Sequence, residues 1–255
     1  MASVEIRAAG RKLAITGPIQ SYLDGYKDYD ADASAVSQIF KQLPEKTTFI
    51  DAGANVGFVS IPLAASRPDL NIICIEPVPH NVEALRANVA TNGLDNITVI
   101  HAAVSDAPGA VSMTSEGPWS TVTANGSVKV DCITLDQFAE LNISGIKIDV
   151  EGHEPYVLAG AGCVLSKRPL AYMEFNLWHL IMRHYDTMTF IETIWERSDI
   201  VSMVCGETIL PPSPNGPEFL FTNIVQHDGL TDLVFRPRGT FGTLLDMVGQ
   251  HFNRE

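Results

Sequence analysis

The chain has 255 residues, of which 45% are hydrophobic and 18% are charged, a composition typical of a folded globular protein. This length is enough for one α/β domain with a substantial core, or for two small domains. The formal net charge is −13 at pH 7. It argues against binding of a nucleic-acid backbone, which requires a concentrated basic face, so we expect no nucleic acid among the partners.

The cysteines and the apolar segments give expectations about the compartment. The four cysteines are scattered and form no C-x-x-C pair, so a reduced thiol at Cys74 and the absence of a structural zinc site are expected. Residues 1–7 include an acid and a base where a signal peptide needs an unbroken apolar stretch. No window approaches the roughly 18 apolar residues of a membrane span. We expect a cytoplasmic protein without a membrane span.

The first 45 residues are mixed in composition, and part of them has a helical pattern. Apolar residues at positions 36, 39, 40 and 43 follow the spacing of an amphipathic helix, which Pro44 ends. Three tyrosines lie among acids and glycine before this helix. We expect residues 1–45 to be helical or irregular.

Residues 48–104 alternate between buried strands and amphipathic helices. The apolar runs predict strands at residues 48–51, 71–76 and 97–104. The helix before the third strand has Gly93 as a plausible C-terminal cap, and Pro62 makes the earlier helix start late or kink. This β-α-β-α-β order predicts a parallel sheet with right-handed crossovers.

The second half continues the alternation with shorter elements and has no internal repeat. Residues 107–127 are rich in turn residues and are expected to form a small hairpin or a loop. We predict strands at residues 128–135, 146–150 and 170–175, helices at 137–141 (capped by Asp136), at 189–197 and around 244–248, and an antiparallel pair at 201–205 and 219–225.

The most informative segment is residues 49–58, where an apolar run ends in Asp51 and glycines follow at 53 and 57. A strand, a tight glycine turn and a helix start are the parts of a nucleoside site. A dinucleotide fingerprint has a third glycine, and an acid two residues before the turn would repel a pyrophosphate. The same acid would attract an ammonium group or ribose hydroxyls. S-adenosylmethionine has both and no phosphate, so the loop that includes Asn55 predicts a methyl-donor site.

Further polar residues at strand ends are candidates for the same ligand. Glu76 ends the second strand about 25 residues after the glycine motif, close to the ~20 expected for an acid that holds ribose hydroxyls. Its alternative role is to cap the following helix. Ser105 and Asp106 follow the third strand and are expected to border the adenine, although Asp106 could instead cap a helix or stabilise a turn.

Residues 147–154 form a second dense group of ionisable side chains. An extended strand would place Asp149, Glu151 and His153 on one side, and such a group belongs at a strand end that faces a cleft. His153 is the group that titrates near neutral pH, so we predict it as the general base, with Asp149 and Glu151 as catalytic partners. Asp149 is also assigned to the donor site.

Three alternatives stand beside this assignment. His153 could cap the helix that begins near Pro155, or Glu151 could pair with Lys147. Asp149, Glu151 and His153 could instead hold a divalent metal such as magnesium. Two carboxylates and a histidine are a common grouping, so we predict no metal site.

The segment after the fifth strand is rich in polar and aromatic residues. Glu174, Asn176 and His179 are assigned to contact the substrate, since such a segment at a cleft edge can act as a lid. Trp178 is expected to pack against the rest of the fold.

In this order and at these spacings, four motifs resemble those of the FkbM-type methyltransferases. They are FIDAGANVG at residues 49–57, IEP at 75–77, AVSD at 103–106 and KIDVEGHE at 147–154. The likeness covers about residues 48–178. It implies an α/β class I methyltransferase fold, Rossmann-like, with a seven-stranded, mostly parallel sheet that has helices on both faces and an antiparallel last strand.

The resemblance also implies a reaction and assigns residues to it. S-adenosylmethionine would be the cofactor, and the acceptor would be a hydroxyl, commonly of a sugar or polyketide. Asp51, Gly53, Asn55 and Gly57 match the donor loop, and Glu76 matches the ribose acid. Asp149, Glu151 and His153 match the signature at the fourth strand, and Glu174 matches the acid of the fifth.

The expected organisation is one methyltransferase domain with two flanking segments. Residues 46–235 form the donor-binding domain, 1–45 an acceptor-contacting or lid region, and 236–255 a helical tail. The expected partner is a small-molecule or glycan acceptor, with a homodimer possible. The alternative functions are a nicotinamide-dependent oxidoreductase, disfavoured by the missing third glycine, and a relative that binds the donor without catalysis.

Overall fold

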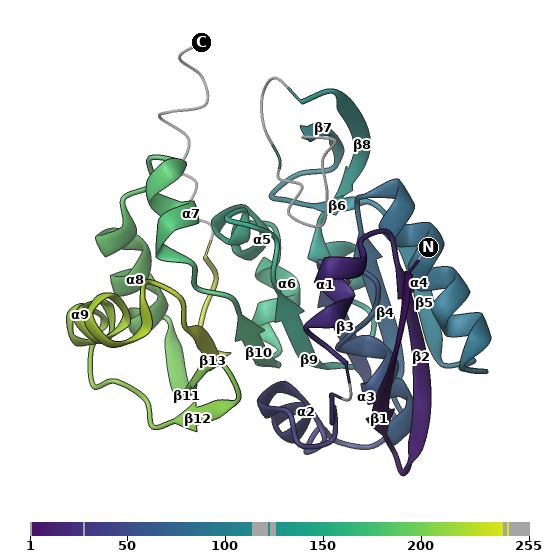
Figure 1. Cartoon of the computed structure of the whole chain (residues 1–255). Helices are drawn as coiled ribbons and strands as arrows, with labels where there is room; N and C mark the ends of the chain where they lie inside the picture. Colours follow the sequence, from purple (N-terminus) through teal and green to yellow (C-terminus); the bar gives the residue numbers. More distant parts are fainter. Residues whose placement is uncertain (1, 28, 114–121, 123–125, 242–243, 245–255) are drawn as a thin grey trace. The chain divides into compact units, whose positions relative to one another are not determined.

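A computed structural model gives the structure, which describes all residues except 1, 28, 114–121, 123–125, 242–243 and 245–255 (Figure 1). The chain divides into two compact units. The first contains Met1–Ala103 and Gly109–Cys132, and the second contains Val104–Pro108 and Ile133–Glu255. The domain boundaries expected at residues 45 and 235 stay a prediction.

The first unit is built on three parallel strands. β3 (Thr48–Ala52) pairs with β4 (Asn71–Glu76), and β4 pairs with β5 (Ile97–His101), each in parallel register. Helix α3 (Ser60–Ser66) connects the first pair and α4 (Pro79–Thr91) the second. The predicted β-α-β-α-β order is confirmed, and the carboxyl ends of β3 and β4 therefore lie at one edge.

Residues 2–17 form a β-hairpin, so the prediction of a helical or irregular start was wrong. β1 (Ala2–Ala8) pairs antiparallel with β2 (Arg11–Gly17). Alternate side chains of both strands are buried, and this period-two pattern is the signal that the sequence analysis missed. Two short helices follow, α1 (Gln20–Asp24) and α2 (Ala35–Phe40), the second at the predicted position.

Asn88 joins this hairpin to the glycine loop. Its side-chain oxygen accepts hydrogen bonds from the backbone N–H of Thr16 (2.8 Å) and from the hydroxyl of Thr16 (2.7 Å). Its amide nitrogen donates to the carbonyls of Thr16 (2.8 Å) and Val56 (2.9 Å). Because the side chain is buried, these bonds fix α4, β2 and the loop against one another.

A second hairpin lies in the turn-rich region of the sequence. β7 (Gly109–Met113) pairs antiparallel with β8 (Val128–Ile133). Val78, Met113 and Val130 form a small apolar core beneath it. This outcome agrees with the hairpin alternative for residues 107–127, of which 114–121 and 123–125 lie outside the described residues.

The second unit contains a parallel pair extended by antiparallel strands. β9 (Ile143–Ile148) is parallel to β10 (Leu170–Met173), and β13 (Asp232–Pro237) is antiparallel to β10. β11 (Ser198–Cys205) and β12 (Thr208–Leu210) add to this arrangement, both antiparallel to their neighbours. The predicted α/β class with a mostly parallel sheet and helices is confirmed. Among the described residues, the first unit contributes three of these strands (β3, β4 and β5) and the second unit five (β9 to β13), whereas the resemblance implied seven.

Helices of the second unit connect these strands. They are α5 (Glu154–Ala159), α6 (Gly162–Ser166), α7 (Leu177–Met182), α8 (Thr187–Glu196) and α9 (Gly216–His227). The helix predicted at residues 137–141 is a 3₁₀ turn, Leu135–Phe138. Its predicted cap, Asp136, instead accepts hydrogen bonds from the backbone N–H groups of Cys163 (3.0 Å) and Val164 (2.9 Å), at the start of α6.

Residues 219–225 belong to helix α9, so the strand predicted there was wrong. The side chain of Asn215 accepts a hydrogen bond from the N–H of Glu218 (2.8 Å), and Pro217 lies in the first turn. This capping overrides the aromatic and β-branched residues that suggested a strand. β11 pairs with β13 and not with residues 219–225. β13 includes residues 236–237, where the predicted C-terminal tail was expected to start. The helix predicted around residues 244–248 lies largely outside the described residues.

All four cysteines lie in described parts of the chain and none of them forms a disulfide; Cys74 is buried. Among the described residues, the helices are too short or too polar to cross a membrane.

Gly57 allows α3 and α4 to pack closely, which gives a test of the fold. Its φ is +98°, and an added Cβ would lie 2.7 Å from side-chain atoms of both Ile61 and Leu85. Gly10 also has a positive φ (+70°), but no atom lies within 4 Å of its added Cβ. We predict that Gly10→Ala costs about 1 kcal/mol from backbone strain, and that Gly57→Ala costs roughly a further 1–3 kcal/mol from overpacking. Urea denaturation measures both, and equal losses would contradict the packing role.

Candidate functional site

The glycine loop after β3 is held against the end of β4. Gly53, Asn55 and Gly57 all have left-handed backbone, with φ of +84°, +51° and +98°. The N–H groups of Gly53 and Ala54 donate to the carbonyl of Ile75 at 2.9 and 3.1 Å. The loop thus has a fixed conformation that glycine makes accessible at two of its three left-handed positions.

Glu76 connects this loop to the start of α4. Its side chain is buried, with 4% of the residue exposed. Oε2 accepts a hydrogen bond from the N–H of Asn55 (2.8 Å), and Oε1 accepts from the N–H of Val78 (3.0 Å) and the side-chain amide of Asn81 (3.2 Å). Glu76 thus contacts both the donor loop and the residues around the start of α4, although α4 has no side-chain cap. The ribose contact of Glu76 stays a prediction.

Asp51 is fully buried and accepts a hydrogen bond from the hydroxyl of Ser60, the first residue of α3. The carboxylate thus braces the turn between β3 and α3. Two acids at neighbouring strand ends suit a ligand with hydroxyl and cationic groups and no phosphate, which fits S-adenosylmethionine. Asp51, Gly53, Asn55, Gly57 and Glu76 would hold that molecule. When bound, it supplies an activated methyl group.

In the second unit, Ser105 links Asp106 to His153. The hydroxyl of Ser105 donates to Oδ1 of Asp106 (2.8 Å), and Nε2 of His153 lies 2.9 Å from the same hydroxyl. Because the hydroxyl has a single proton, Nε2 must be the donor to Ser105. His153 therefore carries its lone pair on Nδ1, which is buried and has no hydrogen-bond partner among the described residues.

The surroundings of His153 keep its ring neutral. The residue is 5% exposed, and its ring stacks on that of Tyr156, with centroids 4.5 Å apart. Burial lowers the pKa of His153 to about 3, and the positive charge of Arg183 contributes to this shift. No side-chain cap of α5 by His153 is present. Its assignment as the base stays a prediction.

The motif at residues 147–154 does not present one face, which corrects the prediction from strand alternation. β9 ends at Ile148, and Glu151 and Gly152 have left-handed backbone with φ of +55° and +86°. This turn sends Glu151 and His153 to different neighbours. Glu154 secures the turn, because its Oε1 accepts from the N–H groups of Val150 (3.0 Å) and Gly152 (3.2 Å).

The ion pair in this motif also differs from the suggested alternative. The ammonium group of Lys147, which is buried, lies 3.0 Å from Oδ2 of Asp149, whereas Glu151 had been suggested as its partner. Asp149 therefore has a local counter-charge directly after β9.

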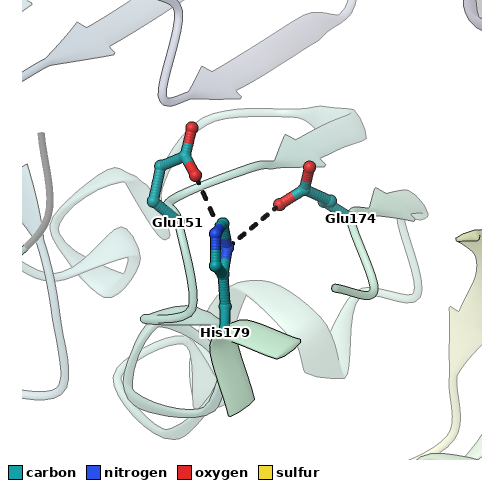
Figure 2. Close-up of side chains that lie close together, drawn as sticks. All are labelled: Glu151, Glu174 and His179. Atoms are coloured by element: carbon teal, nitrogen blue, oxygen red, sulfur yellow. Dashed lines mark ion pairs between the residues drawn. The ribbon is translucent and has the colours of Figure 1, made fainter. Parts of the chain in front are cut away.

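Glu151, Glu174 and His179 come together from three elements (Figure 2). Glu174 directly follows β10, and its N–H donates to the carbonyl of Ile148 (2.9 Å), so the ends of β9 and β10 are adjacent. Nδ1 of His179 lies 3.5 Å from Oε2 of Glu151 and 4.0 Å from Oε2 of Glu174. Asn176 caps α7 by accepting from the N–H of His179 (3.3 Å). The predicted substrate residues thus lie beside one of the predicted catalytic residues.

Burial and mutual repulsion raise the pKa values of these acids. The pKa of Glu174 rises to about 10, chiefly through burial and then through the charges of Asp149, Glu154 and other neighbours. The pKa of Glu151 rises to about 7 for the same reasons, and burial lowers the pKa of His179.

Four residues near this cluster were not assigned from the sequence. Glu154 supports the turn, and Arg183 donates to the carbonyl of Glu151 (3.1 Å). Tyr172 donates a hydrogen bond to Asp232, whose pKa burial raises to about 7. Arg183 lies four residues after His179, so helical spacing could have indicated it; Asp232 lies too far along the sequence to be found in this way.

Comparison with known proteins identifies the family. The model of the "Methyltransferase FkbM domain" matches residues 51–197, more than half of the chain. The chain is also similar to the ribosomal RNA small subunit methyltransferase G of Streptomyces avermitilis (34% identical, 54% of this chain and 56% of that one) and of Pseudarthrobacter chlorophenolicus (29% identical, 49% and 50%). The chain spans about half the length of these relatives, or less in other matches.

Solved structures resemble the chain at low sequence identity. They include a fibrillarin/Nop5p complex (12% identical, 83% of this chain and 84% of that one, TM-score 0.49) and TYW2 of P. horikoshii with MeSAdo (14% identical, 92% and 71%, TM-score 0.47). The family match decides the assignment. The protein belongs to the FkbM family of methyltransferases and uses S-adenosylmethionine as its methyl donor.

Proposed function

We propose that the protein transfers a methyl group to a hydroxyl of a small acceptor such as a sugar, a glycan or a natural product. The observation that carries this proposal is the group of carboxyl side chains at the ends of β9 and β10. Asp149, Glu151 and Glu174 lie there with His179 and Lys147. Carboxylates accept hydrogen bonds from hydroxyl groups, and an acceptor with several hydroxyls offers them several donors.

The same group disfavours an RNA acceptor. A polynucleotide presents a phosphate on every residue, and acidic side chains repel it, as does a chain with a net charge of −13. RNA is the rival acceptor class, because the relatives are named as ribosomal RNA methyltransferases. They match about half of the chain or less. Membership of a methyltransferase family argues against the alternative function of a nicotinamide-dependent oxidoreductase.

The residues of the cluster have distinct proposed roles in methyl transfer. Alignment of the acceptor oxygen with the methyl group supplies much of the rate, so acceptor-binding side chains must fix a single orientation. Asn176 and Glu154 hold the backbone that presents His179 and Glu151. We propose Glu151 and Glu174 as acceptor-binding groups, with Asp149 oriented by Lys147.

A panel of acceptors tests the proposed function. We expect formation of S-adenosylhomocysteine with one or more polyhydroxylated small molecules, and none with a small-subunit ribosomal RNA fragment. The control is the same assay without acceptor. Methylation of the RNA fragment alone would contradict the proposal, and donor binding without turnover on any acceptor would support the non-catalytic alternative.

Donor binding is tested at Glu76 by an isosteric change. Glu76→Gln keeps the oxygen that accepts from Val78, removes the charge and turns an NH₂ group toward the N–H of Asn55, so we predict a loss of roughly 1.5–3 kcal/mol in binding of S-adenosylhomocysteine, measured by isothermal titration. Glu83→Gln, on the exposed face of α4, is the matched control. Equal affinity of the two variants would remove the ribose assignment.

The role of His153 is tested by separating turnover from donor binding. If Nδ1 takes the acceptor proton, His153→Ala lowers turnover about 10²–10⁴-fold and leaves the affinity for S-adenosylhomocysteine unchanged. Ser105→Ala removes the partner of Nε2 and should reduce turnover less, because the Nδ1 lone pair remains. Full turnover of His153→Ala would place the base elsewhere.

A further inference from the structure

We propose that Glu151, Glu174 and His179 bind a divalent metal ion. In the described part of the chain, these three residues form a group whose ligand atoms all lie within 4.8 Å of one another. The sequence had suggested a different set, Asp149, Glu151 and His153, as the alternative metal site. The turn at Glu151 and Gly152 separates that set and directs Glu151 to His179 instead.

The spacing of the three atoms suits a metal ion. Nδ1 of His179 is 3.5 Å from Oε2 of Glu151 and 4.0 Å from Oε2 of Glu174. Two ligands that are each ~2.1 Å from one ion lie about 3.0–4.2 Å apart, depending on the angle between them. Figure 2 shows the two carboxylates approaching the imidazole from opposite sides.

Two polar atoms of this group lack hydrogen-bond partners among the described residues. Oε2 of Glu174 and Nδ1 of His179 are buried, and neither has a hydrogen-bond partner among the described residues. Leaving such atoms unsatisfied is costly, and close acidic groups add to the cost by repulsion. A divalent cation removes both penalties, because it accepts lone pairs from all three atoms and neutralises the carboxylates.

The backbone around the cluster is arranged to bring the three side chains together. An added Cβ on Gly152 would lie 2.9 Å from Cβ of His179 and 2.8 Å from Nε of Arg183, so glycine lets α7 lie close to the turn. Arg183 donates to the carbonyl of Glu151 (3.1 Å), which fixes the same turn from α7. Asn176 caps that helix and so positions His179.

The ligand set favours a first-row divalent ion. One imidazole and two carboxylates leave positions open, whereas Ca²⁺ takes six to eight oxygen ligands. Imidazole suits transition metals and carboxylates also suit Mn²⁺. The side chains are 21% exposed for Glu151 and Glu174 and 28% for His179, so water or an acceptor oxygen can fill the open positions.

One contact opposes the protonation state that metal binding requires, because the side-chain NH₂ of Asn176 is a donor and favours a lone pair on Nε2 of His179. Nδ1 must be free of a proton to bind the ion, so Nε2 carries the proton. The side-chain amide of Asn176 lies 3.4 Å from Nε2. Asn176→Asp replaces that amide by an acceptor and can still cap α7, so it should strengthen metal binding.

Metal titration of the 255-residue chain without donor or acceptor tests the site. We expect one Mn²⁺ to bind per chain, and the loss of the electron paramagnetic resonance signal of free Mn²⁺ measures this binding. Zn²⁺ should bind more tightly than Mn²⁺, and Mg²⁺ more weakly. Glu174→Gln and His179→Ala should each weaken Mn²⁺ binding at least about tenfold, and Asn176→Asp should strengthen it. Glu192→Gln, exposed on α8, is the matched control and should bind as the wild type does.

A measurement on the wild-type chain does not depend on the folding of any variant. With ¹⁵N-labelled histidine, the electron spin echo of bound Mn²⁺ should be modulated by one coordinated imidazole nitrogen. No Mn²⁺ binding, no nitrogen modulation, or equal affinity in the wild type and His179→Ala would each overturn the proposal. These readouts involve no methyl transfer, so they are independent of the proposed acceptor.

Discussion

The crowding of acidic side chains at the ends of β9 and β10 is the constraint on which the second unit depends. Asp149, Glu151 and Glu174 follow these two parallel strands, and Glu154 and Asp232 lie near enough to shift the pKa of Glu174 upward. A parallel pair delivers both strand ends to one edge, so the fold itself creates this concentration of charge. The backbone N–H groups held by Glu154 and the ammonium group of Lys147 offset part of it. The negative charge that is not offset makes the cluster suited to binding hydroxyl groups or a cation.

The left-handed turn at Glu151 and Gly152 decides how these acids are used. Without it, the alternation of an extended strand would place Asp149, Glu151 and His153 on the same side. Because of the turn, Glu151 lies beside His179, and His153 contacts Ser105 instead. Glycine at position 152 serves two needs at once, a positive φ and a close approach of α7. A motif that reads as one functional group in the sequence therefore supplies two separate groups in the structure.

The sequence predicted the parts whose signals are local. β4 lies where the apolar run placed it, and the glycine loop has the left-handed residues that its glycines indicate. The hairpin of β1 and β2 was missed because its alternation was not recognised, and α9 was taken for a strand because its aromatic residues outweighed the Asn215 cap. The grouping of Glu151 with Glu174 and His179 depends on a backbone turn and on a neighbouring strand. Neither can be derived from spacing along one chain segment.

The donor loop and the acidic cluster belong to different units of the chain. Asp51, Asn55 and Glu76 bond to residues of the first unit, whereas Glu151, Glu174 and His179 contact residues of the second. Ser105 and Asp106 belong to the second unit and bond to each other and to His153, although their position after the third strand had suggested that they border the adenine. A change at Ser105 therefore acts first on His153.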